Sequence, residues 1–205
     1  MKIKNLILLT IFPLCCFSIW DTKIHDVNNW RLSITNFGQL GRSQDCWLPG
    51  NVPFIGAGFL FGSISPAVET LVTIGFDPAG GETEYVPGLK NQDHISPLAR
   101  IFMHPADWPP NPDTFPMAPQ IPLTHQESWS CYNDFDSTYH MPADGKPIGI
   151  EVYQTTFADT LAIIRDVVYL KYEVKNCTTY TINDAIISIC WVQPLMWNNG
   201  FILHK

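Results

Sequence analysis

Apolar and polar residues alternate along three stretches in the last third of the chain, residues 148–153, 168–175 and 185–191. A period of two places successive side chains on opposite faces, so each stretch predicts a β-strand with one apolar face. The polar residues 176–184 between the last two stretches predict an antiparallel hairpin. In this hairpin we expect Lys171, Glu173 and Lys175 to face solvent. We expect five side chains to be buried on the opposite face: Leu170, Tyr172, Val174, Ile187 and Ile189.

Two stretches in the first half of the chain predict a second hairpin. Residues 57–64 are apolar with interspersed glycine, as in a buried strand, and residues 70–76 are rich in β-branched and apolar side chains. Residues 77–81, with the sequence Asp-Pro-Ala-Gly-Gly, are a strong turn signal that ends the second stretch. Upstream of both, residues 31–35 alternate like a further strand and run into an Asn-Phe-Gly turn.

The middle of the chain, residues 86–144, has little alternation and carries nine prolines between residues 97 and 142. Such a segment is either a disordered linker or a long ordered loop across a sheet. Its aromatic residues favour the ordered loop, because disordered linkers are poor in aromatics. With no internal repeat and no clear linker, we expect a single all-β domain over residues 19–205, an antiparallel β-sandwich with long proline-rich loops.

Composition agrees with an extracellular β-protein. Only 15% of the residues are charged, while 17 prolines and 13 glycines are present. The formal net charge of −7 argues against nucleic acid and anionic membranes as partners.

The N-terminus predicts export. Lys2 and Lys4 precede an apolar run over residues 6–17 and the small residue Ser18, the layout of a secretory signal peptide over residues 1–18. The run is shorter than the roughly 20 residues that a membrane span needs, so we expect no transmembrane segment and a secreted or cell-surface location. Cys15 and Cys16 suggest a lipoprotein as an alternative, but the residues before them are not small.

Four cysteines follow the predicted signal peptide: Cys46, Cys131, Cys177 and Cys190. In an exported chain they permit two disulfides in three pairings, of which Cys177–Cys190 is the least natural because the two are offset in the predicted hairpin. The alternative is that they are buried thiols, which behave as small hydrophobic residues.

The best metal-ligand candidates are Asn133, Asp134 and Asp136, with the two carboxylates at alternate positions of one loop. Calcium takes six to eight oxygen ligands, and the spacing begins like an EF-hand loop. The glycine and the glutamate that would complete that loop are missing, so we favour the alternative of a turn in which these side chains bond their own backbone.

Aromatic side chains of the middle segment suggest a glycan contact. Trp108, Trp129 and Tyr132 are the candidates for stacking on a sugar face. The alternative is that they anchor the long loops to the sandwich through their large buried area.

An enzyme is the less favoured interpretation. A glycosidase needs a pair of carboxylates, and the chain offers Glu127, Asp134, Asp136 and Glu151. It has no Gly-x-Ser-x-Gly nucleophile motif and no His-Glu-x-x-His motif, and its histidines fit no zinc spacing.

Several segments resemble the opening region of large secreted proteins from environmental bacteria: residues 29–41, 59–62, 126–129, 132–136 and 147–157. Proteins of that kind typically end in a type IX secretion sorting domain. The resemblance implies location and architecture rather than chemistry. After Trp191 the chain departs from the pattern and lacks the sorting tail, which predicts a shortened form.

These observations predict an exported, non-catalytic structural or binding domain of a cell-surface or secreted protein, with glycans or other extracellular proteins as partners. A carbohydrate-binding module and a fragment of a secreted hydrolase are the alternatives.

Overall fold

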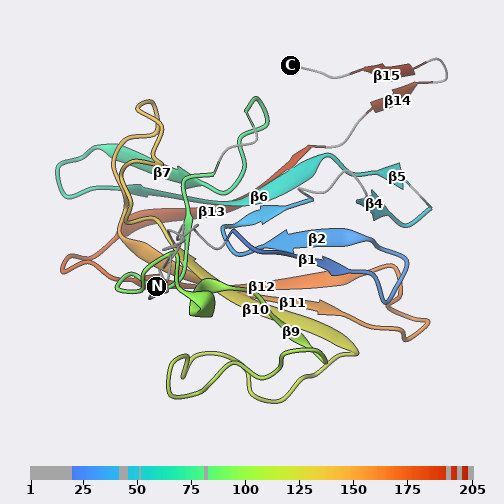
Figure 1. The fold of residues 1–205 in the computed structure, drawn as a ribbon. Helices are drawn as coiled ribbons and strands as arrows, with labels where there is room; N and C mark the ends of the chain where they lie inside the picture. The colour runs from blue at the N-terminus through green and yellow to red at the C-terminus, as the bar shows by residue number, and fades with distance from the viewer. Residues whose placement is uncertain are drawn as a thin grey trace, which may run out of the picture.

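The computed structural model describes residues 20–41, 46–50, 52–80, 83–192, 195–197 and 200–202, the last two groups by backbone alone. The predicted signal peptide, residues 1–18, lies outside the described residues. The chain folds into two antiparallel sheets stacked as layers, which confirms the predicted all-β sandwich (Figure 1). Among the described residues, no helix is both long and apolar enough to cross a bilayer.

The first sheet has six strands, and β6 lies at its centre. One edge of β6 pairs with β13 along nearly its whole length, and the other pairs with β3 and then with β7. The order is β1 (Thr22–His25), β2 (Leu32–Thr35), β3 (Gln39–Leu40), β6 (Gly56–Ile64) and β13 (Asn183–Val192), with β7 (Thr70–Ile74) beside β6.

The second sheet has five strands. Its order is β12 (Val168–Asn176), β11 (Ile150–Ala158), β10 (Gln126–Asn133) and β8 (Val86–Pro87), with β9 (Phe102–His104) also paired to β10. Short elements complete the described chain: β4 (Trp47–Leu48), β5 (Val52–Pro53), a 3₁₀ turn at Pro97–Ala99, β14 (Leu195–Trp197) and β15 (Gly200–Ile202).

The main core lies between the two sheets. Phe59 of β6 stacks on Tyr172 of β12 with ring centroids 4.5 Å apart, and Tyr85 meets Tyr132 of β10 at 5.0 Å. These contacts join inward-facing residues of both layers, as in an aligned sandwich. Other members of this cluster are Phe37, Phe61, Leu71, Ile148, Ile150 and Val152.

A second apolar cluster covers the outer face of the second sheet. Trp129 and Tyr153 point outward from β10 and β11, and Phe115 and Ala118 pack on them from the segment between β9 and β10. This segment therefore lies across the sheet and buries its outer face.

The predicted hairpin of residues 57–64 and 70–76 is confirmed as β6 and β7. The predicted face of residues 168–175 is also correct. Leu170, Tyr172 and Val174 turn inward and pack against the core, while the alternating lysines and glutamate face solvent.

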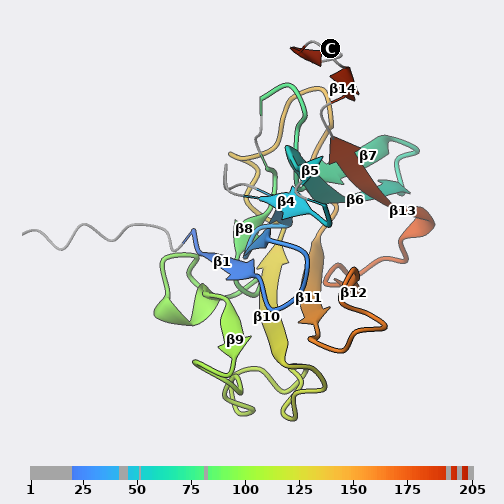
Figure 2. The same cartoon turned by 90° about the vertical axis from the view of Figure 1, so that its right-hand side faces the viewer.

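The predicted hairpin of residues 168–175 and 185–191 is wrong. β12 pairs with β11 in the second sheet, whereas β13 crosses to the first sheet and pairs with β6. A polar connection of this length fits a hairpin and a crossing between sheets equally well, and the local pattern does not distinguish them. The two strands end up on the same side of the sandwich in different layers (Figure 2).

Candidate functional site

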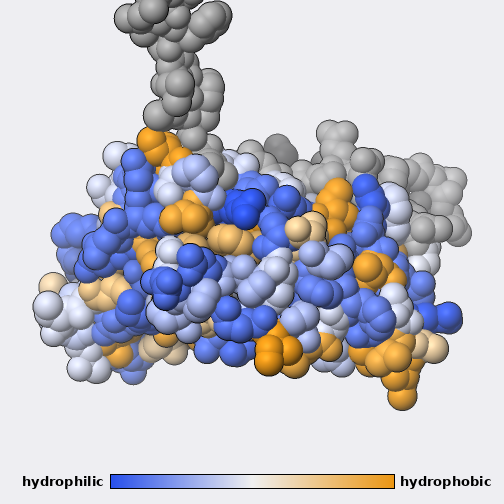
Figure 3. Space-filling view, turned by 60° about the horizontal axis from the view of Figure 1, so that its bottom comes forward, coloured by the Kyte–Doolittle hydropathy of each residue, from blue (hydrophilic) through white to orange (hydrophobic). Residues whose placement is uncertain are grey.

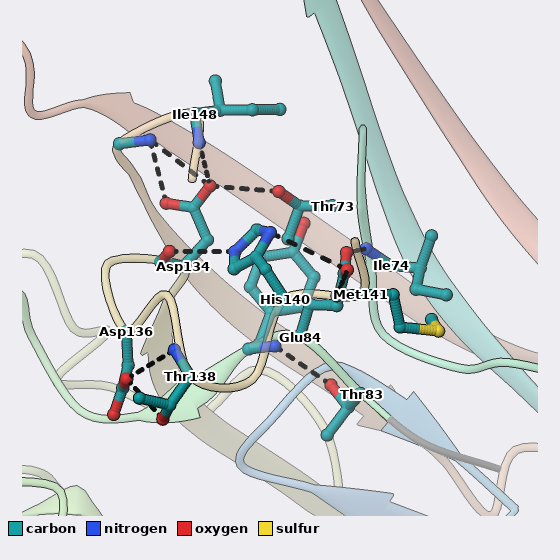
Figure 4. A network of polar contacts seen from close by, with 12 residues as sticks. Thr73, Ile74, Thr83, Glu84, Asp134, Asp136, Thr138, His140, Met141 and Ile148 are labelled. Atoms are coloured by element: carbon teal, nitrogen blue, oxygen red, sulfur yellow. Dashed lines mark hydrogen bonds and ion pairs between the residues drawn. The ribbon is translucent and has the colours of Figure 1, made fainter. Parts of the chain in front are cut away.

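Asp134 follows β10 and turns its carboxylate into the interior, where it is fully buried. Its Oδ2 atom accepts hydrogen bonds from the Ile148 N–H at 2.7 Å and the Thr73 hydroxyl at 3.0 Å. Its Oδ1 atom accepts from the N–H groups of Gly149 at 3.0 Å and Ile150 at 2.8 Å (Figure 4). The carboxylate therefore ties β7 of one sheet to the segment that enters β11 of the other.

Gly149 makes this arrangement possible. Its φ of 92° is a conformation that side chains rarely adopt, and a Cβ there would lie 2.4 Å from Thr178 Cγ2. The resulting bend points three successive N–H groups at one carboxylate, a concave array that favours an anion. Here the anion is the protein's own Asp134.

A second buried carboxylate, Glu84, holds the loop that follows Asp134. Its oxygens accept hydrogen bonds from the Met141 N–H at 2.7 Å and the Ile74 N–H at 3.0 Å. His140 lies between the two acids, with Nδ1 3.7 Å from Glu84 Oε1 and Nε2 3.1 Å from the Asp134 carbonyl (Figure 4). Burial raises the pKa of Glu84, although the bonds from Met141 and Ile74 oppose that shift.

Asn133 and Asp136 stabilise turns. The Asn133 side chain accepts from the Phe135 N–H at 3.0 Å and donates to the Gly88 carbonyl at 2.9 Å. Asp136 Oδ1 accepts from the Thr138 hydroxyl at 2.7 Å and the Thr138 N–H at 3.0 Å. The hydroxyl bond lowers the pKa of Asp136. Both arrangements are side chain-to-backbone turns of the kind expected for these residue types.

Asn133, Asp134 and Asp136, the candidate calcium ligands, do not converge. Their oxygens face N–H and O–H donors, and the two carboxylates turn in different directions (Figure 4). In the part of the chain that the structure describes, no cluster of three or more His, Cys, Asp or Glu side chains is arranged to hold a metal ion. Asn133 and Asp136 match the alternative of local turns, whereas Asp134 bonds Thr73 and residues 148–150, far along the chain.

The other two candidate acids lie far apart on the second sheet. Glu127 pairs with Phe157 near one end of β10, and Glu151 pairs with Asn133 near the other. Six residue positions along a strand correspond to about 20 Å. The carboxylates of glycosidases lie about 5–10 Å apart, so these two do not form such a pair.

Asp134 does not supply the missing partner either. It turns into the interior, whereas Glu151 lies on the outer face of the same sheet, bonded to the Tyr153 hydroxyl at 2.7 Å and to Lys175 Nζ at 3.0 Å. Burial tends to raise the pKa of Glu151, but its hydrogen bonds bring it below its ordinary value. Both groups serve as hydrogen-bond acceptors within the fold.

One shallow hollow of about 290 Å³ carries a histidine and an acid. His125 Nδ1 lies 3.0 Å from Asp159 Oδ1 and 3.3 Å from the Thr160 hydroxyl. The His125 side chain is 59% exposed, so water competes for these bonds. The pair joins the residue before β10 to the first residue after β11.

Trp129 and Tyr132, two candidates for sugar stacking, have no free ring face. Trp129 is 1% exposed and packs on Phe115 at 5.0 Å, while Tyr132 is fully buried against Tyr85. Trp108 is partly buried and packs against the cluster that contains Trp129. The burial of Trp129 and Tyr132 removes them as sugar-stacking surfaces, and the packing of Trp108 agrees with the alternative, in which aromatic side chains anchor the loops.

All four cysteines that the structure describes are free thiols. Cys46 packs in an apolar cluster with Leu32 and Ile34 of β2 and contacts Ser33, whereas Cys131 lies on the outer face of the second sheet. Cys177 and Cys190 are half-buried, and neither forms a disulfide in the structure.

The surface feature that sequence reasoning missed is β13. It is the edge of the first sheet, and Ile187 and Ile189 lie opposite Phe61 and Phe59 on the inward-facing side. They were expected to be buried, yet they are 60% and 39% exposed, and Trp191 on the same side is 45% exposed. The sequence pattern predicted correctly which face of the strand these side chains occupy. However, β12 is the last described strand of the second sheet, and it leaves this face of β13 uncovered.

The outer face of the same strand is also apolar. A groove of about 320 Å³ runs over β6, β7 and β13, and Gly62 forms part of its floor. A Cβ at Gly62 would have no neighbouring atom closer than 3.7 Å, so there is room above this glycine. The lack of a side chain therefore helps to form the groove. Ile186 lines the groove and is 68% exposed.

The face turned to the viewer in Figure 3 has a more hydrophilic surface than β13. Its apolar residues form separate small groups among hydrophilic ones, without a continuous apolar surface. An exposed apolar edge strand with open faces on both sides is therefore the more distinctive candidate for an interaction site.

Comparisons with protein-family models, with curated proteins and with solved structures found no match. The functional argument for this chain therefore depends on its own residues.

Proposed function

We propose that this chain is an exported β-sandwich module that acts by binding through β13, and that it is not an enzyme. The observation that carries the proposal is the exposed apolar character of β13 on both faces. A free strand edge with apolar side chains is a template for a further strand, and proteins normally protect such edges with charge, proline or a covering segment.

The other long edge strand provides an internal comparison. β12 carries Lys171, Glu173 and Lys175 on its outward face, and Lys171 pairs with Glu173 at 2.7 Å. Residues 185–192 of β13 contain no charged residue and no proline. Within one molecule, one edge thus carries protective charges, while residues 185–192 of the other carry neither charge nor proline.

The buried acids support a binding module over a hydrolase. Asp134, Glu84 and Glu151 each accept several hydrogen bonds from backbone or side-chain donors that hold the loops and strands in place. Export is proposed from the N-terminal pattern and from the resemblance to secreted bacterial proteins.

Site-specific photo-crosslinking on intact producing cells tests the binding proposal. A benzophenone amino acid at position 189 should give a crosslinked product of discrete size. The same residue at position 171, on the outward face of β12, should give none because its neighbours are charged and solvated. Equal yields at the two positions, or no product at position 189, would contradict the proposal.

A further inference from the structure

The regular part of β13 fixes which segment can take an added strand. A register shift separates Asn183 from Ile186, whereas residues from Ile186 to Val192 pair with β6 without interruption. Asp184, with a φ of 48°, lies within the irregular part. The usable edge therefore consists of seven residues, 186–192, with Ile189 at the centre.

We propose that the strand added to this edge is β13 of a second copy of the chain, paired antiparallel about a two-fold axis at Ile189. This inference rests on the proposed function and names its partner. A two-fold axis uses the same surface on both copies, so the segment must be complementary to itself.

The seven-residue segment meets that requirement. With Ile189 opposite its own copy, Ile187 faces the partner's Trp191 on the inner side, and the pairing repeats symmetrically. On the outer side, Ile186 faces the partner's Val192, and Ser188 faces the partner's Cys190. Apolar cross-strand pairs of this kind stabilise a ladder, and no like charges are brought together.

The absence of charge from this segment is compatible with a second copy as its partner. The segment has no charged residue, so it offers no electrostatic preference for a charged partner. The chain's net charge of −7 lies elsewhere, and Asp184 falls outside the overlap. An uncharged apolar strand is the fitting partner, and a second copy supplies one.

The pairing also covers surface that a monomer leaves open. Ile187, Ile189 and Trp191 face the inner side of the sheet, where β12 does not reach. Two copies side by side place these side chains against each other. An interface built around one strand is smaller than the roughly 800 Å² per partner of standard complexes, so we expect a weak dimer in the micromolar range.

Sedimentation equilibrium tests the inference on the purified chain in the form that the producing cell releases. Protein concentrations from about 1 to 200 μM cover the low affinity expected for a small interface. The wild type should change from monomer to dimer with rising concentration. Ile189→Lys places two ammonium groups at the axis and should remain monomeric throughout. Ile163→Lys is the matched control, because Ile163 is 91% exposed in the loop between β11 and β12, and it should dimerise like the wild type.

Oxidative crosslinking gives a second measurement that does not depend on weakening the fold. Ile189→Cys in a Cys190→Ser background should form a disulfide dimer, whereas Cys190→Ser alone should not. A monomeric wild type with no such crosslink would overturn the second-copy inference. If position 189 still gave a photo-crosslink to a different molecule, the proposed binding function would stand and only the second-copy inference would fail. If no photo-crosslink formed at position 189, the binding function and the second-copy inference would both fail.

Discussion

At the residue scale, the polar side chains that drew attention in the sequence hold the fold together. Asp134 accepts hydrogen bonds from Thr73 and from three successive N–H groups, and it is fully buried. Asp136, two positions later, bonds only within its own turn. The two residues look alike in the sequence but have very different numbers of long-range partners.

This contrast gives a matched prediction. Asp134→Asn should lower the free energy of unfolding by about 3–5 kcal/mol, because the amide group would face buried N–H donors. Asp136→Asn should cost less than about 1 kcal/mol, since one oxygen remains to accept from Thr138 and the site is near solvent. Urea unfolding of both variants measures the difference. Equal losses would show that Asp134 does not act as the cross-sheet acceptor.

The residue scale also shows the limit of sequence reasoning. The turn roles of Asn133 and Asp136 depend on neighbours within two positions, so they could be predicted. The partners of Asp134 lie 14 to 16 and 61 positions away and come together only in the folded chain. Burial of Trp129 and Tyr132 likewise depends on how a distant loop crosses the sheet.

At the element scale, the face of a strand was easier to predict than its partner. The period of two placed Leu170, Tyr172 and Val174 correctly on the inner side of β12. The hairpin of β6 and β7 follows from a short connection between two apolar stretches. The pairing of β13 with β6 joins segments more than a hundred residues apart, and local pattern carries no signal for it.

Stability measurements on β12 check the assigned face. Leu170→Ala should destabilise the fold by about 2 kcal/mol, the low end for such a change because Leu170 is only partly buried. Lys171→Ala should change stability by less than about 0.5 kcal/mol, because its side chain is exposed and its ion pair with Glu173 lies at the surface. Thermal unfolding followed by circular dichroism compares the two. Equal effects would mean that the strand is shifted by one residue.

At the scale of the whole molecule, the sandwich is well closed on one side and open on the other. The segment between β9 and β10 covers the outer face of the second sheet, and the Asp134 and Glu84 contacts tie loops to both sheets. On the β12–β13 side, the apolar strand β13 pairs with β6 on one edge and with no other described strand on its other edge (Figures 1 and 2).

Export is testable through the N-terminus. The full chain expressed in a bacterial host should be recovered outside the cytoplasm, with an intact mass that matches cleavage after about Ser18. Replacing both Lys2 and Lys4 with glutamate removes the basic start of the signal peptide and should leave the precursor in the cytoplasm. Lys23→Glu changes a lysine just beyond the predicted cleavage site and should be exported normally. Wild-type chain that keeps Met1 and stays in the cytoplasmic fraction would contradict the predicted location. It would also remove the compartment in which the β13 edge is proposed to act.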